Sequence, residues 1–365
     1  MTLTLDKDLL GNTLQIVQKF TSDRINTVQT LQGIYVVLDK KHMHLYATDL
    51  NVYSHASIPL ISAEKTAFII EPKKILEFIQ FLQSGEITIT VTENSITIIQ
   101  GKTTGVFPIA HADEFPLPPK ITEEEQTIPS EFFTKHLPFI LFTASKDDAR
   151  PVLTGINIST TPDGVVMVST DGFRLSVVIE KSNATFPSVI IPASFLQEIL
   201  KFMQSEKQVS FRFSEKEQII SFTFKGMEFC SRIIEGEFPP YNRVIPTETT
   251  TTTKIKKSEL LRNTKLISIF AREHSNVIVY TFSPEGLLLS PKKEANAENS
   301  TTQDIEFKGE PLKVAFNYKY VIDLLNHIEG DDVEIQLSRS DAPVLFKVPQ
   351  NPAFMHVIMP VRLSE

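Results

Sequence analysis

Apolar residues recur at helical spacing in three well-separated stretches of the chain, and alternating apolar and polar residues follow each stretch. The helical stretches begin at Glu71, Ile191 and Phe316. In each, apolar side chains fall at positions i, i+3, i+4 and i+7, the pattern of an amphipathic helix. These positions are Ile75, Phe78, Ile79 and Leu82; Leu196, Ile199, Leu200 and Met203; and Val321, Leu324, Leu325 and Ile328. The alternation that follows, as in EITITV and QVSFRF, predicts strands with one buried face.

These stretches belong to a repeat whose period is close to one third of the chain. Ile75, Leu196 and Val321 hold equivalent positions, so successive copies are 121 and 125 residues apart. A further helical pattern opens each copy, and strands lie between its two helices. The opening helices are marked by Leu10, Leu14 and Val17; by Phe133, Leu137, Ile140 and Leu141 after a predicted N-cap at Ser130; and by Leu260, Thr264 and Ile267. Each third is predicted to fold as helix, strands, helix, strands.

Two segments with linker composition separate the thirds. PLPPKITEEEQTIP is rich in proline and acidic residues, and TETTTTTKIKK is a threonine tract without apolar periodicity. They predict domains at 1–121, 127–246 and 252–365. A chain of 365 residues is also too long for one ordinary core. The predicted fold is α+β, with three similar domains that each pack two helices on antiparallel sheets.

Composition narrows the class of protein. Apolar residues make up 41% and charged residues 22%, as in globular proteins. The net charge of −8 argues against a surface coated in cations, although it allows a local basic face. No apolar run reaches the roughly 18 residues of a membrane span, and the start lacks a signal-peptide pattern, so neither is expected. Cys230 is the single cysteine, which excludes an intramolecular disulfide, fits a reducing cytoplasm and is expected in a buried strand.

Four motifs in order resemble a known family. They are ARPVLTGINI (149–158), STDGFRLS (169–176), IEGEFPPYNRVIP (234–246) and VIMPVRL (357–363). Together with the threefold repeat, they resemble the bacterial DNA polymerase III beta subunit, the sliding clamp. The resemblance implies a ring-shaped, head-to-tail homodimer with helices lining its channel. Such a ring encircles double-stranded DNA without reading its sequence, and acts as the processivity factor of the replicative polymerase.

The resemblance also implies partners and a location. An ATP-driven clamp loader would open the ring, and replicative and repair polymerases and other clamp-binding-motif proteins would then bind it. The location would be the bacterial cytoplasm, associated with the nucleoid during replication. No cofactor or catalysis is implied, and no P-loop or Ser/His/Asp motif is present. A rival interpretation from the residues alone is a rod-like scaffold or adhesion protein of three β-rich repeats.

The resemblance places a partner-peptide groove between the second and third domains. Its apolar side chains would hold an anchor residue, while Arg174 and Arg243 would donate hydrogen bonds to the peptide. Family members commonly have His or Tyr where Phe173 stands, so one polar group at the rim is missing. The alternative is that these residues are only hairpin and inter-domain core. The predicted groove residues are Leu153, Thr170, Gly172, Phe173, Arg174, Leu175, Pro239, Arg243, Val244, Val357, Ile358, Met359, Pro360, Val361, Arg362 and Leu363.

Cations on the inner helices would bind phosphates without reading bases. Family members often read close to R-x-T-L-P-I-L where this chain has RINTVQTLQGIYVV, so its first domain is the most divergent. The alternative is that these lysines and arginines are ordinary solvent-exposed side chains with no role in DNA binding. The predicted channel residues are Lys19, Arg24, Lys73, Lys74, Lys146, Arg150, Lys201, Arg262, Lys265 and Arg272.

Two further features concern the ring seam and metals. Ile269 and Phe270 would pack against the strand around Val106 and Phe107 of a second subunit, unless all four are buried in their own domains. The sequence KKHMHLY places His42 and His44 on one strand face, which is suggestive of a metal site. Because no third ligand is evident beside them, an exposed strand without metal is predicted.

Overall fold

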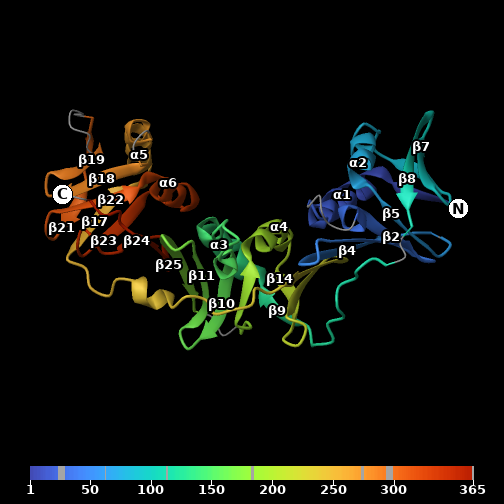
Figure 1. The fold of residues 1–365 in the computed structure, drawn as a ribbon, viewed down its shortest axis with the longest axis horizontal. Helices are drawn as coiled ribbons and strands as arrows, with labels where there is room; N and C mark the ends of the chain where they lie inside the picture. The colour runs from blue at the N-terminus through green and yellow to red at the C-terminus, as the bar shows by residue number, and fades with distance from the viewer. Residues whose placement is uncertain are drawn as a thin grey trace. The chain divides into compact units, whose positions relative to one another are not determined.

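The chain folds into two compact units, each built from two separate stretches of sequence (Figure 1). The computed structural model describes residues 1–23, 29–61, 63–111, 114–181, 185–272, 275–292 and 299–363. Unit 1 contains Met1–Ser130 and Phe202–Ile233, and unit 2 contains Glu131–Lys201 and Ile234–Glu365. The middle third of the chain therefore contributes residues to both units.

One antiparallel sheet of 12 strands forms the framework of unit 1. Within this sheet β4 pairs with β16, with Tyr53 opposite Cys230, so strands of the first and middle thirds share one hydrogen-bonded ladder. Cys230 is buried, as expected, against Tyr53 and Ile219. In spatial order the strands are β1 (Thr2–Asp6), β6 (Glu86–Val91), β7 (Ser95–Gln100), β8 (Thr103–Ala110), β5 (Thr66–Ile70), β2 (Ile34–Leu38), β3 (His42–Thr48), β4 (Val52–Pro59), β16 (Met227–Arg232), β15 (Ile219–Phe224), β14 (Gln208–Ser214) and β9 (Gln126–Pro129).

Unit 2 contains a 9-stranded sheet and a 4-stranded sheet. In the larger one β12 pairs with β25, with Leu175 opposite Val357, which joins the middle third to the last third. The larger sheet runs β13 (Val189–Pro192), β10 (Gly155–Thr161), β11 (Gly164–Thr170), β12 (Arg174–Glu180), β25 (Asn351–Ile358), β24 (Val344–Val348), β23 (Asp332–Leu337), β17 (Thr251–Lys256) and β21 (Glu306–Lys308). The smaller sheet runs β20 (Thr301–Gln303), β19 (Gly286–Pro291), β18 (Val277–Ser283) and β22 (Leu312–Asn317).

The described residues contain an α-helix for each of the six predicted helical patterns. Ser130 is the first residue of its helix and not the residue before it, so the predicted N-cap is wrong by one position. The helices are α1 (Lys7–Val17), α2 (Pro72–Gln80), α3 (Ser130–Ile140), α4 (Ala193–Met203), α5 (Lys257–Ala271) and α6 (Tyr318–His327). Short 3₁₀ helices are η1 (Gln18–Phe20), η2 (Gln29–Gln32), η3 (Leu141–Thr143), η4 (Pro151–Leu153) and η5 (Tyr241–Val244).

A short strand precedes the first helix of each third, which the predicted order of elements omits. These strands are β1, β9 and β17, and each pairs with the first strand after the second helix of the same third. In β1, exposed and buried residues alternate. A five-residue alternation next to a longer helical pattern is a weak local signal, and the distant partner strand supplies the hydrogen bonds that define it.

The apolar faces of the helices form the core against the sheets. Leu10, Leu14 and Val17 of α1 are buried, and α1 packs on β3, β4 and α2, which lies beside it in Figure 1. Leu260 and Ile267 of α5 are buried in the same way, against β18, β19 and α6. Each such burial contributes about 1.5–3 kcal/mol, which fixes the helices and leaves their polar faces exposed.

Candidate functional site

The sequence Thr-Asp-Gly forms the tight turn between β11 and β12. The Oδ1 atom of Asp171 accepts backbone N–H bonds from Phe173 and Arg174 at 2.9 and 3.0 Å. The hydroxyl of Thr170 donates to the carbonyl of Arg174 at 2.6 Å and accepts from the N–H of Gly172 at 3.0 Å. Gly172 has φ of 90°, a left-handed conformation that glycine adopts without strain. The local sequence therefore positions Phe173 and Arg174 at the end of the hairpin.

Arg174 fastens this turn to two other segments of unit 2. Its guanidinium donates from Nε to Asp171 Oδ2 at 3.0 Å, from Nη1 to Asp323 Oδ2 at 2.8 Å, and from Nη2 to the carbonyl of Phe142 at 2.9 Å. The same group lies over the rings of Phe142 and Tyr320, at 5.5 and 4.8 Å. Its side chain is only 9% exposed. All three nitrogens therefore bond within the chain, and the arginine holds the turn in place.

Phe173 points outward from the same turn. Its side chain is 61% exposed, and its ring stacks on Tyr320 with centroids 6.3 Å apart. The carbonyl of Phe173 accepts the N–H of Met359 at 2.9 Å, so the C-terminal segment lies beside the hairpin. The phenyl group offers an apolar surface to whatever contacts this rim.

A depression of about 1220 Å³ lies beside this turn in unit 2. Its walls combine apolar rings with charges of both signs, so it suits an extended ligand with mixed side chains. Two predicted groove residues, Phe173 and Arg174, and two predicted channel cations, Lys146 and Arg150, line it together. The remaining lining residues are Pro138, Leu141, Phe142, Ala144, Ser145, Asp147, Asp171, Gln197, Leu200, Tyr320, Asp323 and His327.

Other predicted groove residues surround a neighbouring apolar cluster. Leu175 and Val357 are buried in this cluster, with Phe238, Tyr241 and Ile245 packed against it and partly exposed. Arg243 and Val244 of η5 are exposed and line a second depression of about 910 Å³. Leu153 and Thr170 are buried, whereas Gly172 and Pro239 are exposed.

The C-terminal segment after β25 packs against strands of the last third of the chain. The N–H of Val361 donates to the carbonyl of Ala315 at 2.8 Å, and Val361 and Leu363 pack on Val277 and Val279. Ile358 is buried, Met359 and Pro360 are half-buried, and Arg362 is exposed. Of the predicted C-terminal groove residues, Met359 is thus the one hydrogen-bonded to the Phe173 turn, while Val361 and Leu363 support the last domain.

The predicted channel cations are exposed wherever the structure describes them; Arg24 lies outside the described residues. In unit 1, Lys73 lines a depression of about 460 Å³ between α1 and α2, and Lys74 is 3.5 Å from Glu71. In unit 2, Arg262 and Lys265 project from α5, with Arg262 also 3.4 Å from Glu259. The other exposed members are Lys19, Lys146, Arg150, Lys201 and Arg272.

Apolar side chains are exposed on both elements of the predicted seam. On α5, Ile269 is 57% and Phe270 41% exposed, and Leu266, which is not among the predicted seam residues, is 48% exposed. On β8, Val106 is 64% exposed. Phe107 is half-buried, because its ring packs edge-on against Phe78 of α2 with centroids 5.4 Å apart. Ile269, Phe270 and Val106 are thus not buried in their own domains.

Comparisons with known proteins cover the whole chain. Family models of the DNA polymerase III beta subunit match it three times, as the N-terminal domain at 1–119, the central domain at 127–240 and the C-terminal domain at 242–362. The beta sliding clamps of Bacillus subtilis and Halalkalibacterium halodurans are 27% and 26% identical, over 99% of this chain and 100% of theirs. The crystal structure of the Thermotoga maritima beta subunit superposes with a TM-score of 0.92 at 22% identity, with 100% of both chains covered.

The chain belongs to the DNA polymerase III beta subunit family.

Members of this family are beta sliding clamps, the processivity subunits of DNA polymerase III, and they are not catalytic. The predicted α+β fold of three similar domains is confirmed, and the scaffold or adhesion alternative is wrong.

One buried cluster contains serine, histidine and threonine side chains, which in other proteins serve in catalysis. Ser176 Oγ lies 2.8 Å from His356 Nδ1 and 2.7 Å from Thr143 Oγ1, but Ser176 and His356 are completely buried. This cluster therefore packs the clamp and has no access to substrate.

Burial also determines the protonation of His356. The pKa of its imidazole lies well below the ordinary value, first because the ring is removed from water and second because the Arg174 cation is near. The ring stacks on Phe142 and Phe354, with centroids 5.6 and 6.3 Å away. The clamp thus holds a neutral histidine directly behind its hairpin turn.

The residues that hold Arg174 are not among those predicted from the sequence. Phe142, Tyr320 and Asp323 come from a 3₁₀ helix and from α6, more than a hundred residues apart in sequence. Asp323 occupies a polar position of the amphipathic pattern, where a carboxylate is unremarkable without knowledge of its partner. No helix in the described part of the chain has the length and apolarity that crossing a membrane requires.

Proposed function

We propose that two copies of this chain form a head-to-tail ring that encircles double-stranded DNA and slides along it. The observation that carries this proposal is the succession of three beta-subunit domains along one chain. Exposed cations on α2, α5 and the loop after α3 support it, because they can exchange one phosphate for the next without reading bases. The net charge of −8 is compatible with a closed ring, which retains DNA by topology.

The seam of the ring is proposed to join α5 of one copy to β8 of the other. Ile269 and Phe270 supply exposed apolar surface on α5, and Val106 supplies it on β8. Such side chains lose their water contact when a second copy covers them, at about 25 cal/mol per Å² of apolar surface. Phe107 supports Val106 from the opposite face of the strand through its contact with Phe78.

Partner peptides are proposed to dock on the surface formed by the Phe173 turn, η5 and the start of the C-terminal segment. Phe173, Val244 and Met359 are its accessible apolar members, and Arg243 its accessible cation. Leu175, Val357 and their buried neighbours form the floor beneath them. The proposed ligands are short segments of replicative and repair polymerases and of the clamp loader, which would act in the bacterial cytoplasm.

The division into domains is proposed to follow the linkers. The boundaries at 1–121, 127–246 and 252–365 are supported by the three matched ranges and by residues 114–125 and 245–250, which lie outside the helices and strands. Each of these domains contains two helices and begins with a strand that its own later strand completes.

A topological experiment tests the proposed function. The protein is loaded on nicked circular DNA with its cognate loader and ATP, and the DNA is then linearised. A ring slides off the ends of linear DNA, so we expect the bound protein to be lost on linearisation and retained on the circle. Equal retention on both substrates contradicts encirclement. Blocking both ends of the linear DNA with a bulky protein is the matched control and is expected to restore retention.

A further inference from the structure

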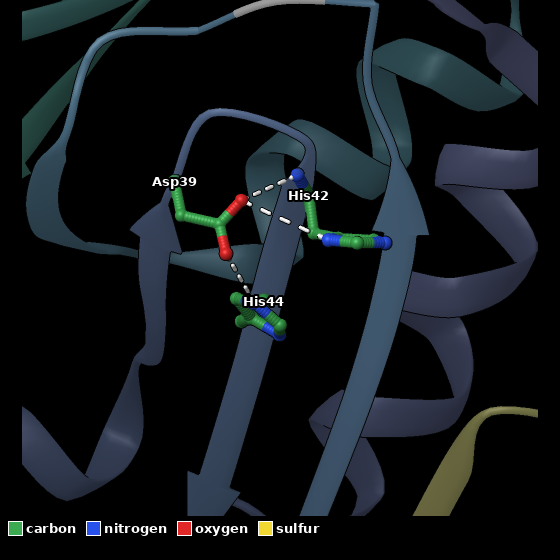
Figure 2. A group of neighbouring side chains, drawn as sticks. All are labelled: Asp39, His42 and His44. Atoms are coloured by element: carbon green, nitrogen blue, oxygen red, sulfur yellow. Dashed lines mark hydrogen bonds and ion pairs between the residues drawn. The ribbon is translucent and has the colours of Figure 1, made fainter.

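A cluster of metal-ligating side chains lies on the hairpin between β2 and β3, in unit 1. Asp39 follows the last residue of β2, and His42 and His44 project from the same face of β3 because they are two residues apart. Figure 2 shows the Asp39 carboxylate facing both histidines. The pair His42 and His44 alone predicts no metal site, because a third ligand is missing. Asp39, three positions before His42 in the motif DKKHMH, supplies it.

The carboxylate of Asp39 is held by the turn itself. Its Oδ1 atom accepts N–H bonds from the backbone of Lys41 and His42, both at 2.7 Å. Its Oδ2 atom faces His44 and lies 3.2 Å from Nε2 of that ring. The ring of His42 approaches from the other side, with Nδ1 3.8 Å from Oδ1. One ligand atom from each of the three residues lies within 4.8 Å of the others.

His55 of β4 orients His44 from behind. Nδ1 of His44 lies 3.0 Å from Nε2 of His55, and the His55 ring stacks on Tyr46 at 4.4 Å with only 6° between the planes. When His44 carries its proton on Nδ1 and donates it to His55, the lone pair of Nε2 points at the Asp39 carboxylate. In this tautomer no proton lies between His44 Nε2 and Asp39 Oδ2, and a cation can bind between these two atoms in its place. Metal-binding histidines commonly have this kind of second hydrogen bond.

We propose that Asp39, His42 and His44 bind one divalent first-row transition metal ion, of which Zn²⁺ is the representative. Two imidazole nitrogens and one carboxylate oxygen suit Zn²⁺, whereas Mg²⁺ and Ca²⁺ prefer sets made only of oxygen. Zinc–ligand distances of about 2.0–2.2 Å require the donors to close to about 3.5 Å, which the exposed His42 ring can achieve by rotation. Side-chain exposures of 47% for Asp39 and 43% for His42 leave room for water to complete the coordination.

The site is separate from the proposed groove and from the predicted channel cations that the structure describes, which lie on other elements. Its ligands come from a two-stranded hairpin and its orienting residue from the next strand of the same sheet. A bound ion would cross-link the turn to β3, and it would stabilise the folded state because the unfolded chain does not hold the ligands together.

Titration calorimetry with ZnCl₂ on the full-length protein, freed of any histidine tag, tests this proposal. One Zn²⁺ per chain is expected for the wild type, with MgCl₂ giving no heat of binding at the same concentrations. His42→Gln and His44→Gln are each expected to weaken Zn²⁺ binding at least tenfold. His111→Gln, which changes an exposed histidine outside the cluster, is the matched control and is expected to bind like the wild type.

Co²⁺ provides a spectroscopic test of the same ligands. Its visible absorption bands are expected to appear with the wild type and to be lost in Asp39→Asn/His44→Gln, while the far-UV circular dichroism of that variant stays unchanged. His55→Phe should weaken Zn²⁺ binding about 10–100-fold through loss of the orienting hydrogen bond, and His55→Gln should recover part of it. Absence of one-to-one Zn²⁺ binding, or Zn²⁺ binding that persists in Asp39→Asn/His44→Gln, overturns the proposal.

Discussion

The guanidinium of Arg174 and the carboxylate of Asp323 meet at 2.8 Å across 149 residues of sequence. Arg174 begins β12 of the central domain, and Asp323 lies on α6 of the C-terminal domain. This ion pair therefore fixes the hairpin turn against the neighbouring domain within unit 2. The position of Phe173 depends on it, because that residue immediately precedes Arg174.

Replacement of Arg174 by lysine should separate the charge of this residue from its geometry. A lysine cannot serve Asp171, Asp323 and the carbonyl of Phe142 together, because its single ammonium lacks the planar fork. We expect Arg174→Lys to reduce the free energy of unfolding by about 1–3 kcal/mol in urea denaturation. Asp323→Asn should cost about 1 kcal/mol, since Asp323 is half-exposed and Asp171 still pairs with the arginine. An Arg174→Lys protein as stable as the wild type would contradict the anchoring role.

The proposed groove predicts a loss of partner binding without loss of assembly. Val244→Asp places a charge on its exposed apolar surface, and we expect a fluorescent peptide from the cognate replicative polymerase to bind at least tenfold more weakly, or about 1.4 kcal/mol. Fluorescence anisotropy measures this change. Ile61→Asp, at an aliphatic residue 98% exposed in unit 1, is the control and should bind normally. Equal affinity in Val244→Asp and Ile61→Asp would place the peptide elsewhere.

The proposed seam predicts a change of mass. In Ile269→Glu/Phe270→Glu, two carboxylates replace exposed apolar side chains of α5, and burying them in an interface is costly. Sedimentation equilibrium is expected to show a monomer of about 41.2 kDa for this variant and a dimer for the wild type. Val244→Asp serves as the matched control and should remain dimeric. A dimeric double variant would require another seam.

The channel cations predict a change in salt dependence. Removing Lys73 and Lys74 with alanine deletes two exposed charges per chain at the start of α2. If each lysine neutralises one phosphate, the slope of log K against log salt should fall by about 0.9 for every lysine removed, in each copy of the ring. DNA binding in a salt titration measures it, with Lys308→Ala, an exposed lysine on β21, as the control. An unchanged slope would show that neither lysine neutralises a DNA phosphate.

The buried His356 predicts a loss of stability in mild acid. Because its pKa is lowered in the folded state, the unfolded chain binds a proton below the ordinary value of 6.5 while the folded chain does not. Stability should therefore fall as pH drops below about 6.5, by about 1.4 kcal/mol per pH unit from this residue. His356→Phe preserves the aromatic stacking and should reduce the slope between pH 6.5 and 5 in urea denaturation, while His55 and His136, whose pKa values are also lowered by burial, maintain the rest of the dependence. His111→Gln should retain it, and identical slopes in all three proteins would contradict the assignment.

The helices and most strands could be predicted because their signals are local. Leu10, Leu14 and Val17 lie on one helix face whatever the rest of the chain does, and the structure buries all three. The strands β1, β9 and β17 were missed because each is short and is defined by a partner about 80 residues away. Local patterning thus predicts the elements better than it predicts their pairing.

The groove residues were proposed from motifs, and the structure shows which of them are accessible. Phe173, Arg243 and Val244 are exposed, whereas Leu175 and Val357 lie beneath the surface. The sequence could not show that Arg174 would be used internally, because that outcome depends on Asp323 from another domain. Asp39 is a different case, since its spacing to His42 and His44 is visible in the sequence.

The pairing of β4 with β16 and of β12 with β25 bears on how far sequences in this family can diverge. Both domain borders are closed by main-chain hydrogen bonds, which any residue except proline can donate. Side chains at these borders can change while the ladders remain. Relatives that retain about a quarter of their residues, such as the Bacillus subtilis clamp at 27% identity, can therefore keep the same joints between domains.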